Sequence, residues 1–370
     1  MKICHILVRW KISQFLTRSI LKRQIHEFQF FKCICQGMMS AATGTQCIQK
    51  ITLRARGGPG GQAFLSAVPQ GVKKFTTQQW RTTVKFLLNL PLPYHQAQCV
   101  CKAQMDDKGE HAMKCTTNRG WAKMRHDELR DAVISILRQS GASVKVEPSY
   151  QTLGITPHRY NQSRNSTSPF RRMGPDGWIN FMEDKDGATI TFDITHSYPF
   201  KGSDQQKDYS AKDDEYLIRE KEKRKRRTYA DLVEQGQARH IGFIPLVSLT
   251  HGRWNMEMKK ILQQAAASWM TRQGVPENSG TWNRTKSVLM TQWWQELSSR
   301  LQKGNIRVLQ EQYNKALRGT RERRDPGGDI RNLHVSDATH RTNARTSSQI
   351  ISSIGSILQA VPSVELQGVL

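Results

Sequence analysis

The stretch at residues 188–195 reads ATITFDIT, and it determines how the middle of this chain is expected to fold. Ile190, Phe192 and Ile194 alternate with polar residues, so that every second side chain is apolar. A period of two places these apolar side chains on one face of an extended chain. The pattern therefore predicts a β-strand with one buried face, and with Asp193 on the other face.

Further strands and helices are predicted on both sides of this stretch. Residues 144–147 alternate as a short strand, residues 178–182 form a second one, and residues 241–249 have the composition of a buried strand. Apolar spacings of three and four residues predict helices over 121–139 and from 258 to about 274. We therefore expect an α/β fold, in which a mixed sheet is flanked by helices.

The composition along the chain predicts five parts. Residues 1–50 form a basic N-terminal extension, which is either native or an accidental upstream extension of the reading frame, and residues 51–120 contain a linker helix and a Cys/His segment. Residues 121–275 form the α/β core, and residues 276–318 form an extension of one or two helices. Residues 319–370 are rich in polar residues and are predicted to be a disordered tail.

Two aspartates are of interest because the predicted strands can bring them together. Asp176 lies in the turn sequence GPDG, and 16 residues separate it from Asp193. Carboxylates on adjacent strands suit Mg²⁺, which can bridge a scissile phosphate and activate water. Glu147 is a candidate third carboxylate, and a positive charge could come from Lys221, Lys223 or Lys225. Taken singly, Asp176 also fits an ordinary Pro-Asp-Gly turn, and Asp193 also fits a strand-end cap.

A second group of residues has the ligand types of a zinc site. Three cysteines and one histidine fall within 17 residues: Cys99, Cys101, His111 and Cys115. Four thiolate and imidazole ligands suit a tetrahedral Zn²⁺ with no open position, so the predicted site is structural. The Cys-x-Cys spacing is tighter than the usual Cys-x2-Cys. Unrelated reduced cysteines near a surface histidine are therefore the alternative.

The predicted helix at 121–139 carries the sequence Arg125-His126-Asp127. A helical histidine after a Cys/His segment could contact a phosphate or an active-site carboxylate. The alternative is a surface or capping histidine, and the sequence does not separate the two.

The charge of the chain indicates a polyanionic partner. The sequence contains 56 Lys and Arg against 31 Asp and Glu, a formal net charge of +25. The basic residues are spread along the chain, as a surface that follows a phosphate backbone requires. Nucleic acid is the simplest such partner, with DNA expected first and RNA second. No stretch approaches 18 uninterrupted apolar residues, so no membrane-spanning helix is expected.

Together these motifs resemble the region downstream of the polymerase in non-LTR retrotransposon proteins, in which a zinc knuckle precedes a restriction-like PD-(D/E)xK endonuclease. The resemblance runs from about residue 58 to about residue 317 and follows the family's order of motifs: the knuckle ending at Cys115, Arg125-His126, Val146-Glu147-Pro148, Pro175-Asp176, Asp193-Ile194-Thr195, a basic helix ending at Tyr229, Gly242-Phe243-Ile244-Pro245, His251-Gly252-Arg253-Trp254 and Leu301-Gln302-Lys303-Gly304-Asn305. It implies a restriction-endonuclease-like fold and a metal-dependent DNA endonuclease that nicks target DNA to prime reverse transcription.

The resemblance also implies roles for individual residues. Asp176 and Asp193 match the family's metal ligands, and Lys225, four residues before Tyr229, best fits its catalytic lysine. The usual Arg or Lys before Pro-Asp is Gly174 in this chain, and the polymerase is missing.

Two alternatives to an active endonuclease stay open. One is a zinc-dependent nucleic-acid-binding protein, a catalytically inactive remnant of a retroelement, and the other is a decayed copy with no selected function. The odd number of cysteines, seven, indicates a reducing compartment. The run of Lys and Arg at 221–227 indicates the nucleus, and the acid-poor residues 1–32 leave a mitochondrial presequence as the alternative.

Overall fold

The computed structural model describes residues 51–324 except 53, 59, 93–97, 157–173, 182–188, 201–212, 214 and 278. The predicted extension at 1–50 and residues 325–370 of the predicted tail lie outside the described residues. The described residues up to Arg321 belong to one unit.

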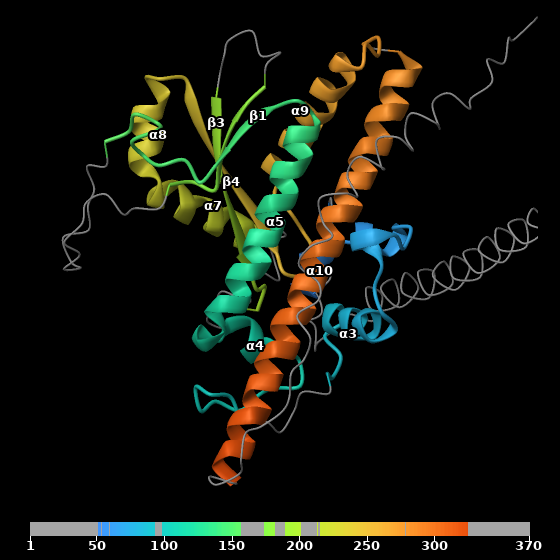
Figure 1. The fold of residues 1–370 in the computed structure, drawn as a ribbon, viewed down its shortest axis with the longest axis vertical. Helices are drawn as coiled ribbons and strands as arrows, with labels where there is room; N and C mark the ends of the chain where they lie inside the picture. Colours follow the sequence, from blue (N-terminus) through green and yellow to red (C-terminus); the bar gives the residue numbers. More distant parts are fainter. Residues whose placement is uncertain are drawn as a thin grey trace, which may run out of the picture. The chain divides into compact units, whose positions relative to one another are not determined.

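A mixed sheet lies at the centre of this unit (Figure 1). Its described strands are β1 (Ser143–Val146), β2 (Gly177–Asn180), β3 (Thr189–Ser197) and β4 (Ile241–Leu249), in that order across the sheet. β1 and β2 pair antiparallel, β2 and β3 pair antiparallel, and β3 and β4 pair parallel. Parallel neighbours need a crossover connection, and α7 (Tyr216–Thr228) and α8 (Ala230–Gln237) lie in it. The predicted mixed α/β architecture is confirmed.

Helices cover both faces of the sheet. On one face, Phe192 and Ile194 pack in a cluster with Leu129 and Val133 of α5 (Arg119–Gln139) and with α9 (Met256–Arg272). On the other face, the apolar side chains of β4 pack against α7, α8 and Tyr229. Figure 1 shows α5 and α8 on opposite sides of the strands. Because side chains alternate along β3, Asp193 points away from α5 and toward α7.

The last described element is a single helix, α10 (Gly280–Arg324), where one or two helices were expected. No proline interrupts residues 280–324, so nothing in the sequence breaks the backbone hydrogen bonding. Leu297 and Leu301 join the cluster formed by α5, α9 and the sheet. Farther along, Ile306 and Leu309 join a second cluster. The helix continues through residues 319–324, which were predicted to be disordered.

The second cluster is built on the segment before the sheet. This segment contains short 3-10 turns at Ala63–Ser66, Gly71–Lys73 and Thr116–Asn118, together with the helices α3 (Thr77–Leu87) and α4 (Glu110–Lys114). Phe86 and Leu87 of α3 pack there with Cys99, Tyr198 and the second half of α10. The Cys/His segment is thus joined to the core through α10. Among the helices of the described ranges, none has the length and apolar character needed to cross a membrane.

Candidate active site and metal centre

The pairing of β2 with β3 brings Asp176 beside Asp193. Gly177 pairs with Phe192, so the next residues outward, Asp176 and Asp193, lie opposite each other. The amide of Ile194 donates a hydrogen bond to Oδ2 of Asp176 over 2.6 Å. Gly177 allows this close pairing, because a Cβ atom there would lie 2.3 Å from the Phe192 ring. The structure therefore brings together the two carboxylates that the sequence analysis selected.

Asp193 is almost fully buried, and two side chains contact its carboxylate. Lys225 Nζ lies 2.5 Å from Oδ2, and the Tyr229 hydroxyl donates to Oδ1 over 2.5 Å. Burial and then the negative charge of Asp176 raise the pKa of Asp193, while Lys225 and Tyr229 act in the opposite direction. Burial and the charge of Asp176 therefore outweigh the effects of Lys225 and Tyr229 on the Asp193 carboxyl.

Tyr229 acts at this site as a hydrogen-bond donor. It follows α7 directly, and its ring packs on Phe243 of β4 with centroids 4.7 Å apart. Burial and then the charge of Asp193 raise the pKa of Tyr229 well above its ordinary value. The hydroxyl therefore keeps its proton and fixes the orientation of the Asp193 carboxylate. Tyr229 entered the sequence analysis only as the end of the basic helix, because its separation of 36 residues from Asp193 gives no local signal.

Of the three candidate lysines, Lys225 is the one whose ammonium is placed on Asp193. Lys223 is exposed, two residues away along α7, so it projects from a different side of the helix. The role of Lys225 as the catalytic lysine stays a prediction.

Glu147 follows β1 next to the aspartate pair, but its carboxylate has a different partner. Its amide donates to the carbonyl of Asp176 over 3.0 Å, which brings the two backbones together. Its carboxylate pairs with the guanidinium of Arg130 on α5. The role of Glu147 as a third metal ligand stays a prediction.

His126 extends the site toward α5. Its Nε2 lies 3.1 Å from Oδ1 of Asp176, so the side chain contacts one of the two paired carboxylates. Behind it, the half-buried His196 ring lies 5.9 Å from the His126 ring, edge to face, and its Nδ1 lies 2.5 Å from Oγ of Ser248. Burial and nearby cations, Arg125 first, lower the pKa of His196 well below its ordinary value, so this ring is neutral.

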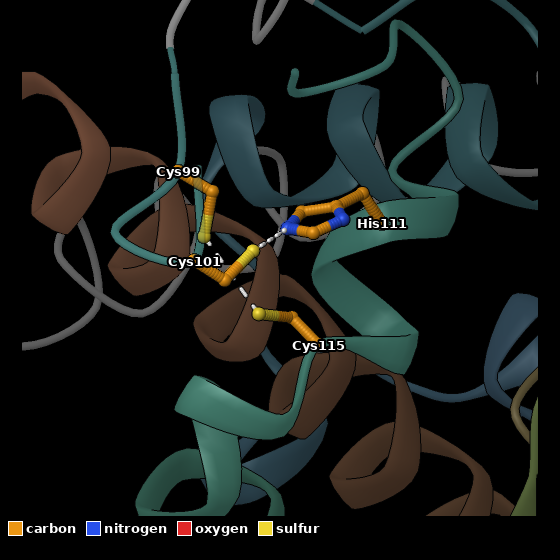
Figure 2. A group of neighbouring side chains, drawn as sticks. All are labelled: Cys99, Cys101, His111 and Cys115. Carbon is orange, nitrogen blue, oxygen red and sulfur yellow. Dashed lines mark hydrogen bonds between the residues drawn. The ribbon is translucent and has the colours of Figure 1, made fainter. Parts of the chain in front are cut away.

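The Cys/His segment forms a separate cluster that could hold a metal ion such as zinc (Figure 2). One ligand atom from each of Cys99, Cys101, His111 and Cys115 lies within 4.8 Å of every other. The Sγ atoms of Cys99 and Cys115 are 3.7 Å apart, and Cys101 Sγ is 3.3 Å from His111 Nε2. Zinc–sulfur bonds of about 2.3 Å in a tetrahedron place two sulfurs about 3.8 Å apart, so the spacing fits zinc.

Hydrogen bonds around this cluster fix the start of α4 and favour the thiolate form of Cys99. Asp106 accepts hydrogen bonds from the amides of Lys108, Glu110 and His111, which fixes the start of α4. Although burial raises it, hydrogen bonds from the Cys101 amide and from neighbouring side chains, His111 first, lower the pKa of Cys99 to about 6. Cys99 is therefore largely the thiolate at neutral pH, which is the form that binds metals.

A residue that sequence analysis missed completes the surroundings of this cluster. Gln312 of α10 is fully buried, and its Nε2 donates to Cys99 Sγ over 2.8 Å. It also lies 3.3 Å from Oγ1 of Thr117. Because Gln312 and Cys99 are 213 positions apart, no local pattern could have paired them.

No protein-family model matches this chain, and no curated protein matches it either.

Proposed function

We propose that this chain is a Mg²⁺-dependent DNA endonuclease that hydrolyses phosphodiester bonds. One observation carries the proposal: Asp176, directly before β2, lies opposite Asp193 of the adjacent β3, and the Lys225 ammonium lies against Asp193. Two carboxylates that can hold a metal ion, with a lysine beside them, are groups that suit metal-assisted cleavage of a phosphodiester.

The donors at this site fit Mg²⁺. Both aspartates offer hard oxygen ligands, and Mg²⁺ is usually held by one or two carboxylates together with water and phosphate oxygens. The pKa of Asp193 is raised partly by the charge of Asp176, so a divalent cation between them would relieve this repulsion. When bound, Mg²⁺ would supply a Lewis acid and a more acidic water molecule.

The residues of the chain have distinct tasks in this scheme. Asp176 and Asp193 would hold the ion and thereby position a scissile phosphate. Lys225 would stabilise the negative charge that develops on the phosphate, or orient the attacking water. Tyr229 keeps the Asp193 carboxylate in one orientation through its hydrogen bond to Oδ1.

DNA is the substrate that the charge distribution supports best, and RNA is the second candidate. Helix α7 bears Lys225 on its inner side and exposes four cationic side chains next to it: Lys223, Arg224, Arg226 and Arg227. Such a surface can neutralise the phosphates on either side of the cleaved bond. The net charge of +25 is consistent with a polyanionic substrate.

The order of elements supports a restriction-endonuclease-like fold of retroelement origin. Helix α5, strands β1 to β3, the α7–α8 crossover, β4 and α9 follow the order of the motifs that resemble non-LTR retrotransposon endonucleases. In this proposal the Cys/His cluster is a structural zinc knuckle, and the protein acts in the nucleus.

Nicking of supercoiled plasmid by the full chain tests the proposal, with Mg²⁺ or with EDTA and beside Asp176→Asn. We expect nicking only with Mg²⁺ and only with Asp176 present, while the affinity for DNA in EDTA stays within about threefold of wild type. Nicking by Asp176→Asn at the wild-type rate would refute the assigned site.

A zinc-dependent nucleic-acid-binding protein without catalysis is the second candidate. The Cys/His cluster and the exposed cations of α7 favour it, because neither depends on the aspartate pair. Tight DNA binding with no nicking in Mg²⁺ or Mn²⁺ would select this function over the first.

A further inference from the structure

We propose that His126 is a positioning residue of the nuclease site, which holds the Asp176 carboxylate in the orientation that binds the metal. The inference rests on the proposed function, since it concerns the metal site of that reaction. His126 Nε2 lies 3.1 Å from Oδ1 of Asp176. A carboxylate only accepts hydrogen bonds, so Nε2 carries the proton and donates.

The contact matters because it restrains the second oxygen of Asp176. Oδ2 is already held by the amide of Ile194 over 2.6 Å, a contact that the strand pairing fixes. With His126 on Oδ1, both oxygens have a donor, and rotation of the carboxylate about its Cβ–Cγ bond would break both contacts. Each oxygen keeps a lone pair for a cation, because a carboxylate offers about four acceptor sites.

Packing around α5 fixes the place of His126. The preceding residue, Arg125, is buried and donates to Oδ1 of Asn305 over 2.8 Å. Gly304 leaves room for it, since a Cβ atom at 304 would lie 2.6 Å from Arg125 Cγ. On the other side, the neutral His196 ring meets the His126 ring edge to face.

A donor on a ligating carboxylate tunes metal affinity without binding the metal itself. Loss of such an outer partner typically costs about 10- to 100-fold in metal affinity or activity. For His126, 27% exposed at the side chain, truncation also leaves Asp176 open to water. We therefore expect the effect in the metal dependence of the reaction and not in the affinity for DNA.

The test compares His126→Ala with His126→Gln, whose amide nitrogen reaches a position similar to Nε2. The nicking rate is measured against Mg²⁺ concentration, and Mn²⁺ binding to the zinc-loaded protein is measured by electron paramagnetic resonance. His240→Asn is the control, because this exposed histidine has a positive φ of 54° that asparagine tolerates.

His126→Ala should raise the half-saturating Mg²⁺ concentration and the Mn²⁺ dissociation constant by about 10-fold or more. His126→Gln should restore most of both, and DNA affinity in EDTA should stay unchanged in both variants. Two results would refute the positioning role in a wild type that nicks DNA: a wild-type metal dependence in His126→Ala, or a His126→Gln variant that is as impaired as His126→Ala. Either result would leave the proposed endonuclease function intact. If wild type neither nicks nor binds Mn²⁺ through Asp176, both proposals fail.

Discussion

Arg125 of α5 and Asn305 of α10 form a hydrogen bond of 2.8 Å between two side chains that are both buried. Burial lowers the pKa of Arg125 to about 10, so the guanidinium is still charged at neutral pH. Asn305 also donates to the carbonyl of Thr250 over 2.6 Å. A buried cation thus joins α5 to α10.

Removal of this acceptor should destabilise the protein. Asn305→Ala leaves the Arg125 guanidinium and the Thr250 carbonyl without this partner, so we expect the free energy of unfolding to fall by about 2–4 kcal/mol. Urea denaturation measures this change. The control is Asn314→Ala, the same substitution at an exposed position of α10, with an expected effect below about 0.5 kcal/mol. Equal effects at the two positions would contradict the assigned role of the pair.

Gln312 should contribute to the affinity of the Cys/His cluster for zinc. Gln312→Ala removes the donor from Cys99 Sγ, and the loss of an outer-shell partner costs about 10- to 100-fold in metal affinity. Competition with a chromophoric chelator measures the zinc dissociation constant.

We expect about one Zn²⁺ per purified wild-type chain and less in Cys101→Ser. Full zinc content in Cys101→Ser would refute the cluster as the zinc site.

In the metal-free protein, the ionised Asp193 carboxylate should lower the free energy of unfolding. Its pKa is raised on folding, so the folded state binds this proton more tightly than the unfolded state. The free energy of unfolding therefore falls as the pH rises from 3.8, the ordinary pKa of an aspartate, to the raised pKa of Asp193 in the folded protein. Above the raised pKa the loss is complete. Asp193→Asn removes the charge, and we therefore expect it to unfold at higher denaturant than wild type in EDTA at pH 7.

Mg²⁺ should stabilise the wild type relative to Asp193→Asn. At a concentration 100-fold above its dissociation constant, Mg²⁺ stabilises the wild type by about 2.7 kcal/mol, and it should not stabilise Asp193→Asn. Thermal denaturation with and without Mg²⁺ measures both effects, and Asp131→Asn on the exposed side of α5 is the control. Equal stabilisation of wild type and Asp193→Asn would show that the ion binds elsewhere.

His251 should make the fold sensitive to acid. It is fully buried among Phe86, Tyr198 and Phe200, and burial followed by the charge of Arg56 lowers its pKa to about 3. The unfolded chain takes up this proton near pH 6.5, so the stability from His251 is present above pH 6.5 and is lost as the pH falls to about 3. At pH 5 the loss is on the order of 2 kcal/mol.

A variant isolates this contribution. His251→Phe should unfold with a smaller pH dependence between pH 7 and pH 5 than wild type does, as measured by denaturation at each pH. Some dependence should remain, because the pKa of His196 is lowered as well. An unchanged pH dependence would show that His251 is not a source of the acid sensitivity.

Lys225 should matter for the rate of nicking far more than its neighbours on α7. Lys225→Ala removes the charge that faces the aspartate pair, and loss of one such stabilising group costs about 10²-fold or more in rate. Lys223→Ala is the matched control, since it removes an exposed lysine from the same helix. It should weaken DNA binding slightly and leave the rate at saturating DNA nearly unchanged. Equal rate losses would contradict the assignment of Lys225.

The strands and most helices could be predicted because their signals are local. The alternation is found in β3 from Thr189 onward, and the apolar run at 241–249 coincides with β4, since burial on a sheet face imposes a short period. Helix α8 was missed, because it follows α7 at Tyr229 without a glycine or proline between them. The continuity of α10 was likewise left open, because apolar spacing does not show whether two helical stretches are joined.

In the candidate sites, too, local contacts could be predicted from the sequence and long-range contacts could not. Asp176 and Asp193 could be paired from the sequence, since one strand pairing relates them. The contacts of Asp176 with His126 and of Cys99 with Gln312 join residues 50 and 213 positions apart, and only tertiary packing determines them. Glu147 lies where its position after β1 predicts, beside Asp176 at the backbone, whereas the ion pair of its carboxylate with Arg130 has no local signal in the sequence.

The placement of α10 has a consequence for biosynthesis. A chain leaves the ribosome from its N-terminus, so the Cys/His segment and all four described strands emerge before residues 280–324 exist. Both apolar clusters need side chains of this helix, Leu297 and Leu301 in one and Ile306 and Leu309 in the other. Neither half of the protein can therefore finish folding before α10 has been synthesised, and nascent chains truncated before α10 should depend on chaperones to stay soluble.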